Sequence, residues 1–120
     1  MTHTREAKRI LRHQRIRKKV IGTTQKPRLC VHRSLKNMQA QVVDDVTGKI
    51  LFGISTLDKN LRQKIKSGGN VQAAAVLGEA IAIKAKTSGV SKVCFDRGGN
   101  LYHGRIKAFA EAVRKGGIQF

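Results

Sequence analysis

The stretch "PRLCVHRSLKNMQAQVVDDVTGKILFGIST", residues 27–56, decides the fold because it holds three strand patterns in succession. Apolar residues alternate with others in "RLCVHRS" and again in "NMQAQVVDD", as they do in strands that bury one face. The sequence "DDVTGK" is a hairpin turn signal, and "ILFGIST" follows it as the third strand. The residues expected on the buried face of the first two strands are Leu29, Val31, Met38, Ala40 and Val42. Short links between the strands predict an antiparallel meander.

The segment that follows predicts two helices. Thr56 is expected as the N-cap of a short helix, "LDKNLRQKIKS", which Gly68 and Gly69 end. Asn70 is expected to cap the next helix, "VQAAAVLGEAIAIKAKTSG", which ends at Gly89. Most of its residues are Ala, Val, Leu or Ile, so we expect it to lie flat on the sheet.

The last part of the chain predicts a fourth strand and a final helix. The strand "VSKVCFD" follows a helix, so it is expected to join the sheet by a crossover. The final helix begins near Gly104, and Gly116 and Gly117 stop it. Its expected core stripe is Ile106, Phe109, Ala110 and Val113. The whole pattern predicts an α+β (α/β) fold, with a small mixed four-stranded sheet backed by helices.

Positive charge is concentrated in the N-terminal part of the chain. The 120 residues carry 25 Lys and Arg against 7 Asp and Glu, which gives a formal net charge of +18. Residues 1–36 contain a single acid, Glu6. The chain therefore divides into a basic arm, residues 1–26, and a globular α/β body, residues 27–120. A nucleic acid is the usual polyanion that such a charge attracts.

The basic arm has the spacing of a helix. Lys8, Arg12, Arg15 and Lys19 recur on one helical face, and the apolar residues form no continuous stripe. Like charges at this density oppose an isolated helix. We expect the arm to be frayed when free and helical when it binds phosphates.

Four segments in order resemble a known family. They are "PRLCVHRSLKNMQAQVVDD", "STLDK", "GGNVQAAAVLGEAIA" and "VCFDRGGNLYHGRIKAFAEAVRKGGIQF". With the total length and the basic arm, they make the chain similar to the family of bacterial large-subunit ribosomal protein L18, which binds 5S rRNA. The resemblance implies a structural role without a cofactor or small-molecule substrate. Its implied partners are 5S rRNA, 23S rRNA and the neighbouring proteins of the central protuberance, on a cytoplasmic ribosome, with an organellar ribosome left open.

The chain departs from the family pattern on the second strand. Family members commonly carry an aromatic residue there, in a pattern like His-Ile-Tyr-Ala-Gln, where residues 37–41 of this chain are "NMQAQ". Gln39 can keep a hydrogen bond to RNA but cannot stack on a base. Tyr102 is the single tyrosine, so a stacking platform is not expected. Recognition should rest on phosphate contacts and on the shape of folded RNA.

Three groups of residues are predicted to bind RNA. The arm supplies Arg5, Lys8, Arg9, Arg12, Arg15, Arg17, Lys18 and Lys19. The tip of the first hairpin supplies Arg33, Ser34 and Lys36. The loop before the last helix supplies Arg97, Gly98, Gly99, Tyr102, His103 and Arg105. For Tyr102 and His103, packing and capping in the loop are the competing interpretations.

Other functions fit the sequence less well. Catalysis would need a nucleophile or a second carboxylate near Asp96 and His103, so Asp96 is expected instead to cap the turn or to pair with an arginine. A DNA-binding architectural protein is the alternative function, but no recognition-helix pair or zinc-finger spacing is present. A membrane arm would need bulky apolar residues opposite the charges, and the arm has one leucine. Cys30 and Cys94 belong to no ligand-spaced cluster, so no metal site is expected.

Overall fold

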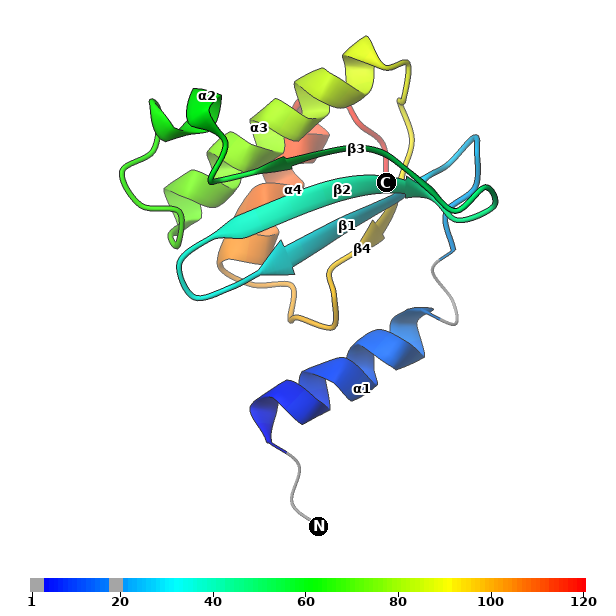
Figure 1. Ribbon diagram of the computed structural model, residues 1–120, viewed down its shortest axis with the longest axis horizontal. Coiled ribbons are helices and arrows are strands. Elements are labelled where there is room, and N and C mark those ends of the chain that lie inside the picture. Colours follow the sequence, from blue (N-terminus) through cyan, green and yellow to red (C-terminus); the bar gives the residue numbers. More distant parts are fainter. Residues whose placement is uncertain (1–3, 18–20) are drawn as a thin grey trace.

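The computed structural model describes residues 4–17 and 21–120 (Figure 1). Its helices are α1 (Arg5–Arg17), α2 (Lys59–Arg62), α3 (Val71–Thr87) and α4 (Arg105–Lys115). Its strands are β1 (Arg28–Arg33), β2 (Met38–Asp44), β3 (Lys49–Ser55) and β4 (Cys94–Asp96). The predicted α+β class, with four strands and a helical arm, is confirmed.

The strands form one mixed sheet in the order β3-β2-β1-β4. β1 pairs with β2, and β2 with β3, in antiparallel fashion, so the predicted meander is confirmed. β4 pairs with β1 in parallel, because α3 carries the chain back across the sheet. The sheet thereby places the loop after β4 beside the far end of β1.

The hydrophobic core lies between the sheet and the helix pair α3–α4, which covers one of its faces (Figure 1). All five residues predicted for the buried face of β1 and β2 are at most 3% exposed. The predicted stripe of α4 is also buried, with Phe109 at its centre. Gly78 of α3 allows the two helices to approach closely, because a Cβ there would lie 2.6 Å from the carbonyl oxygen of Phe109.

The segment between β3 and α3 differs from its prediction. Thr56 is not an N-cap: its side chain is buried, and its Oγ1 accepts a hydrogen bond of 3.0 Å from the Met38 backbone nitrogen. Asp58 caps α2 instead, and α2 ends at Arg62, well before Ser67. The tertiary contact of Thr56 with β2 outweighs its local preference for a helix start. Asn70 does cap α3, with its Oδ1 accepting from Ala73.

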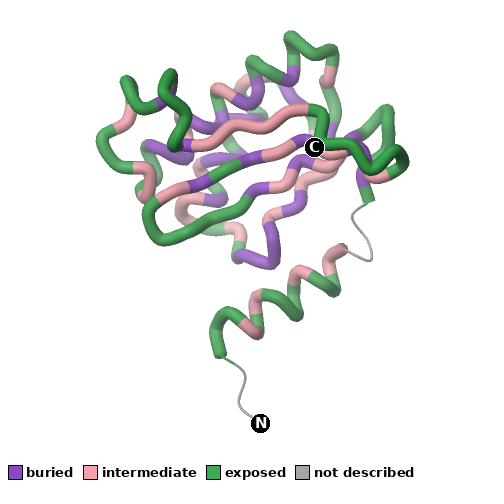
Figure 2. Tube along the Cα trace, viewed as in Figure 1, coloured by how far each residue is buried: buried purple, intermediate pink, exposed green. Residues whose placement is uncertain are grey.

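The opposite face of the sheet has no helical layer over its middle, and α1 lies along its β4 side (Figures 1 and 2). No residue of α1 is buried, and Arg9 and Arg12 of this helix donate side-chain hydrogen bonds to the body. None of the helices in residues 4–17 and 21–120 is long and apolar enough to cross a membrane. The predicted boundary between arm and body stays a prediction.

Candidate nucleic-acid interface

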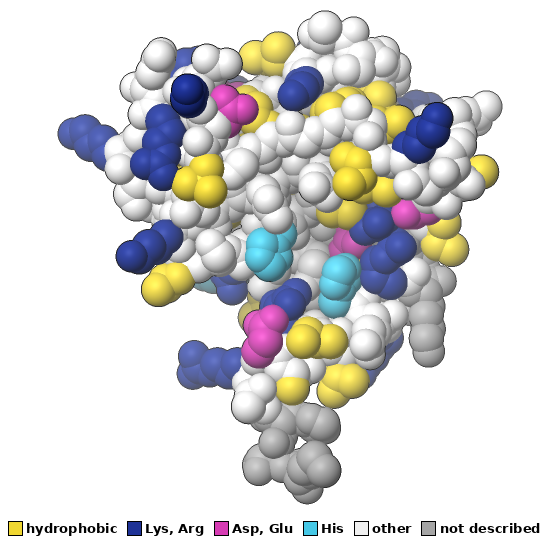
Figure 3. Space-filling model, viewed as in Figure 1, with side chains coloured by type: hydrophobic (Ala, Val, Ile, Leu, Met, Phe, Trp, Pro, Cys, Tyr) yellow, Lys and Arg dark blue, Asp and Glu magenta, His cyan; other side chains and the backbone are white. Residues whose placement is uncertain are grey.

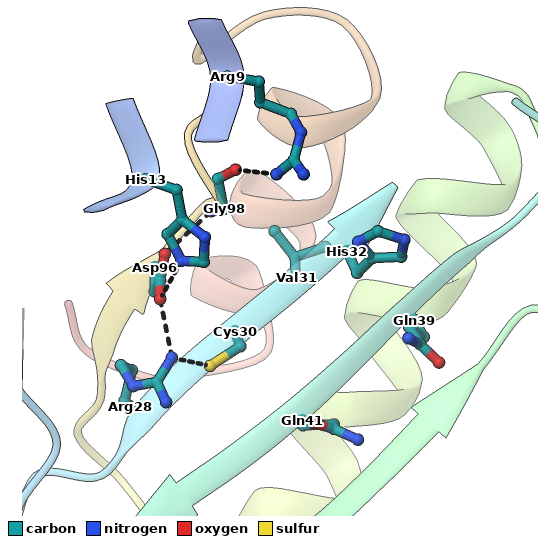
Figure 4. A pocket seen from close by; sticks show the side chains of 10 residues that line it. All are labelled: Arg9, His13, Arg28, Cys30, Val31, His32, Gln39, Gln41, Asp96 and Gly98. Atoms are coloured by element: carbon teal, nitrogen blue, oxygen red, sulfur yellow. Dashed lines mark hydrogen bonds and ion pairs between the residues drawn. The ribbon is translucent and has the colours of Figure 1, made fainter. Parts of the chain in front are cut away.

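Two arginines of α1 attach the arm to the turn that follows β4. Arg9 Nη1 donates a hydrogen bond of 2.6 Å to the Gly98 carbonyl oxygen (Figure 4). Arg12 Nε donates one of 2.9 Å to the Gly99 carbonyl oxygen. A turn that exposes successive carbonyls toward guanidinium groups therefore orients the helix on the body.

Asp96 connects the arm, the sheet and the turn. Its carboxylate is 1% exposed, and Oδ1 accepts a hydrogen bond of 2.9 Å from the Gly98 backbone nitrogen. Oδ2 accepts one of 2.8 Å from Arg28 Nη1 and lies 3.1 Å from His13 Nε2 (Figure 4). The expectation that Asp96 caps the turn and pairs with an arginine is confirmed.

These contacts keep the Asp96 carboxyl ionised. Burial alone would raise its pKa, but hydrogen bonds from Gly98, His13 and Arg28 outweigh burial and lower it. Arg28 is fixed on its other side by Asp45, whose oxygens lie 3.0 Å from Nε and 3.2 Å from Nη2. Sequence reasoning missed His13 and Arg28. The available signal for His13 was its position four residues after Arg9, on the same helical face.

Gly98 and Gly99 have positive φ angles of 65° and 79°, which glycine adopts at least cost. Gly99 also faces α1 directly: an added Cβ would collide with the Arg9 carbonyl oxygen and approach the His13 nitrogen. The glycine pair therefore serves the docking of α1, and a bound phosphate is not needed to explain it.

Replacing Gly99 with alanine should displace α1 as well as strain the turn. Gly89→Ala is the matched control, because Gly89 has a φ of 80° and open space around its Cβ position. The control should lose about 1–2 kcal/mol of unfolding free energy in urea. Gly99→Ala should lose at least about 1 kcal/mol more and make the arm more sensitive to limited proteolysis. Equal losses in both variants, with equal proteolysis, would contradict the role assigned to Gly99.

The open face of the sheet is polar, and Arg28 and Asp96 line its hollow together with uncharged side chains. His32, Gln39 and Gln41 project from β1 and β2 into a hollow of about 190 Å³ beside α1 (Figure 4). Lys and Arg side chains surround this face at its rim (Figure 3). Gln39 is exposed, so its amide is available for a hydrogen bond to a ligand.

The two cysteines, Cys30 and Cys94, are free and half-buried. Burial raises the pKa of Cys30 to about 11, so its thiol stays protonated near neutral pH. Within the described part of the chain, no group of three or more His, Cys, Asp or Glu side chains is arranged to hold a metal ion.

The structure separates the predicted RNA-binding residues of the arm into two sets. Arg5, Lys8 and Arg15 are exposed, whereas Arg9 and Arg17 are half-buried against the body. Arg17 Nη1 lies 3.6 Å from an Asp45 oxygen. Arg12 is exposed apart from its bond to Gly99. Lys18 and Lys19 lie outside the described residues.

The predicted residues of the first hairpin lie at the end of β1. Arg33, Ser34 and Lys36 are exposed. Ser34 shapes the turn, because its Oγ accepts a hydrogen bond of 3.2 Å from the Asn37 nitrogen. Arg33 and Lys36 are therefore the side chains of this group that remain available for phosphates.

In the loop before α4, Tyr102 is half-buried and packs against the core. Its hydroxyl accepts a hydrogen bond of 3.2 Å from Arg114, which favours the packing interpretation. His103 is exposed, and Arg97 and Arg105 are half-buried. The loop brings Gly104, the residue before Arg105, into the same groove lining as Arg33, which its position in the sequence did not indicate.

The sequence of the chain matches one family of known proteins. The model of "Ribosomal L18 of archaea, bacteria, mitochondria and chloroplast" matches residues 3–120. A large ribosomal subunit protein uL18 from Heliobacterium modesticaldum is 54% identical over 116 residues, covering 97% of this chain and 95% of the relative. The protein of the same name from Thermosynechococcus vestitus is 50% identical over 120 residues, the full length of both chains.

Proposed function

This chain belongs to the ribosomal L18 family, whose members are structural proteins and not enzymes, and from this premise we propose that it binds 5S rRNA in the large ribosomal subunit. It would help to attach 5S rRNA to 23S rRNA in the central protuberance, beside neighbouring ribosomal proteins. The bacterial relatives agree with the predicted location in the large subunit of a cytoplasmic ribosome.

The observation that carries this proposal is the set of exposed cations on α1. Glu6 is the one acid of this helix, and Arg9 binds it at 2.6 Å. Among the described ion pairs, none involves Arg5, Lys8 or Arg15. A helix that presents such unneutralised charge to solvent gains most from a phosphate backbone.

The rest of the interface supports contacts with folded RNA more than stacking on bases. The open sheet face offers histidine and glutamine side chains, and its rim supplies cations (Figure 3). Side-chain amides can read base edges or the 2′-hydroxyl, and guanidinium groups bind phosphate oxygens. Asp96 is fully engaged with Gly98, Arg28 and His13.

Co-sedimentation tests the assignment in cells. A tagged copy of the chain should sediment with large ribosomal subunits, and 5S rRNA should be recovered with it after mild dissociation. A tagged Asp96→Asn variant and a tagged triple variant, Arg5→Gln, Lys8→Gln and Arg15→Gln, serve as graded controls. A tagged wild-type chain that sediments free of large subunits would contradict the proposal.

A further inference from the structure

A basic groove of about 400 Å³ runs between the first half of α1, the end of β1 and the loop before α4. Its cationic lining consists of Arg5, Lys8, Arg9, Arg12 and Arg33. Glu6 is the one acid in the lining, and it is bound by Arg9. The groove adjoins the hollow over the open sheet face, which His32, Gln39 and Gln41 line, because Arg9 lines both.

Arg105 lies next to this groove, directly after its lining residue Gly104. Its Nη1 is the one buried side-chain nitrogen or oxygen that lacks a hydrogen-bond partner among residues 4–17 and 21–120. A buried guanidinium nitrogen without an acceptor costs free energy, because water no longer satisfies it. Such a group in a native fold calls for an explanation, and a bound anion that supplies the acceptor is one.

The positive charge of Arg33 raises the free-energy cost of burying the charged Arg105 side chain. Arg33 and Gly104, the residue before Arg105, line the same groove. Burial and, next, the charge of Arg33 lower the pKa of Arg105. No carboxylate among the described residues forms an ion pair with either of them. Arg28 shows the contrast, because it is also half-buried but has both Asp45 and Asp96 as partners.

The alternation of β1 explains how Arg33 reaches this place. Leu29 and Val31 of β1 are buried under the helices, and Arg33 follows them at the same two-residue spacing. Arg33 therefore belongs to the face that packs toward α4. It stands at the end of the strand, where that face meets solvent.

The N-terminus of α4 is a second feature that favours the binding of an anion. The helix has 11 residues and no acid in its first turn, and its N-cap, Gly104, makes no side-chain hydrogen bond. The first backbone N–H groups of a helix lack partners within the helix, and its dipole favours an anion there. This feature supports the two arginines and would not define a site without them.

We propose that Arg33 and Arg105 together bind a single phosphate group of the RNA backbone at the α4 end of this groove. The inference rests on the proposed RNA-binding function and adds a discrete site to it. The anion supplies the acceptor that Arg105 lacks and separates the two positive charges. The site is then one shared contact and not two independent ones.

A double-mutant cycle tests the shared contact. Arg33→Gln, Arg105→Gln and the double variant are compared with wild type in filter-binding titrations against 5S rRNA at several salt concentrations. Each single variant should lose about 10-fold in affinity, and the double variant should lose little more than either single variant. The slope of log affinity against log salt should fall by about one in the double variant, as expected for one phosphate.

The matched control is Arg62→Gln with Lys115→Gln, two exposed cations elsewhere, which should change affinity no more than about 3-fold.

A second measurement needs no RNA. Inorganic phosphate should raise the melting temperature of the wild-type protein more than that of the double variant, at matched ionic strength. Without phosphate, Arg105→Gln should melt no lower than wild type, because it removes a crowded and unsatisfied charge.

The outcomes separate the phosphate site from the general function. Losses that add fully in the double variant, or normal affinity of that variant where wild type binds 5S rRNA well, would overturn the shared site only. Failure of wild type to bind 5S rRNA would instead overturn the proposed function. In that case an equal stabilisation of wild type and double variant by phosphate would overturn the site as well.

Discussion

Asp96→Asn should lower the free energy of unfolding by about 3 kcal/mol, measured by urea denaturation. The asparagine can still accept a hydrogen bond from Gly98, but it leaves Arg28 with a single charged partner, Asp45. It also removes the charge that His13 of α1 approaches. We therefore expect lower stability of the body together with a loosened arm.

The matched control is Asp58→Asn. Asp58 is exposed, and asparagine caps a helix about as well as aspartate does, so this change should cost less than about 0.5 kcal/mol. An Asp96→Asn variant that is as stable as the control would mean that the Asp96 network contributes nothing to the fold.

The effect of Asp96 should depend on pH in a defined direction. Its pKa is lowered in the folded protein, so the unfolded chain binds a proton more readily as the pH falls. The stability contributed by the carboxylate is present in full above the unfolded pKa, about 4, and is lost as the pH falls through the lower folded value. Wild type and Asp96→Asn should therefore differ most at about pH 7, and the difference should shrink as the pH falls below about 4. A difference that grows on acidification would contradict this sign.

The largest effect on RNA binding is expected from the exposed side of α1. The triple variant Arg5→Gln, Lys8→Gln and Arg15→Gln keeps Arg9, Arg12 and His13, which attach the helix to the body. Its affinity for 5S rRNA should fall on the order of 100-fold, and its salt slope should fall by between about two and three. Filter binding at several salt concentrations measures both quantities.

A control of equal charge separates a specific arm contact from general attraction. Lys59→Gln, Lys64→Gln and Lys66→Gln remove the same charge from exposed positions in and after α2, on a different part of the body. This control should lose less than about 5-fold in affinity. If the two triple variants lose affinity equally, net charge drives binding and the arm has no special position on the RNA.

Much of the fold could be predicted because its patterns are local. Alternation in residues 28–44 determines which face of β1 and β2 is buried, and the spacing of Ile106 and Phe109 determines the inner face of α4. The parallel pairing of β4 follows from the handedness and length of a crossover. The prediction that Thr56 caps a helix was wrong, because Thr56 forms a hydrogen bond with Met38 instead. That bond depends on a strand residue that lies 18 positions earlier in the sequence.

The site was less predictable because its contacts join residues that are far apart in the sequence. The sequence showed which regions are rich in basic residues. It did not show which of these residues attach the arm to the body and which are exposed to solvent. Arg9 and Gly98 are separated by 89 positions, and His13 and Asp96 by 83. Arg33 and Arg105 come to the same groove because the end of β1 lies beside the start of α4. Only the folded chain brings such pairs together.

Competition binding tests the central claim most directly. Labelled 5S rRNA bound to the wild-type protein, at one stated salt concentration near physiological, is challenged with unlabelled 5S rRNA or with duplex DNA of equal length. We predict that 5S rRNA displaces the label at a concentration at least about 100-fold lower than duplex DNA does. Displacement by duplex DNA at the same concentration as 5S rRNA, or at a lower one, would contradict the account and favour a DNA-binding architectural protein.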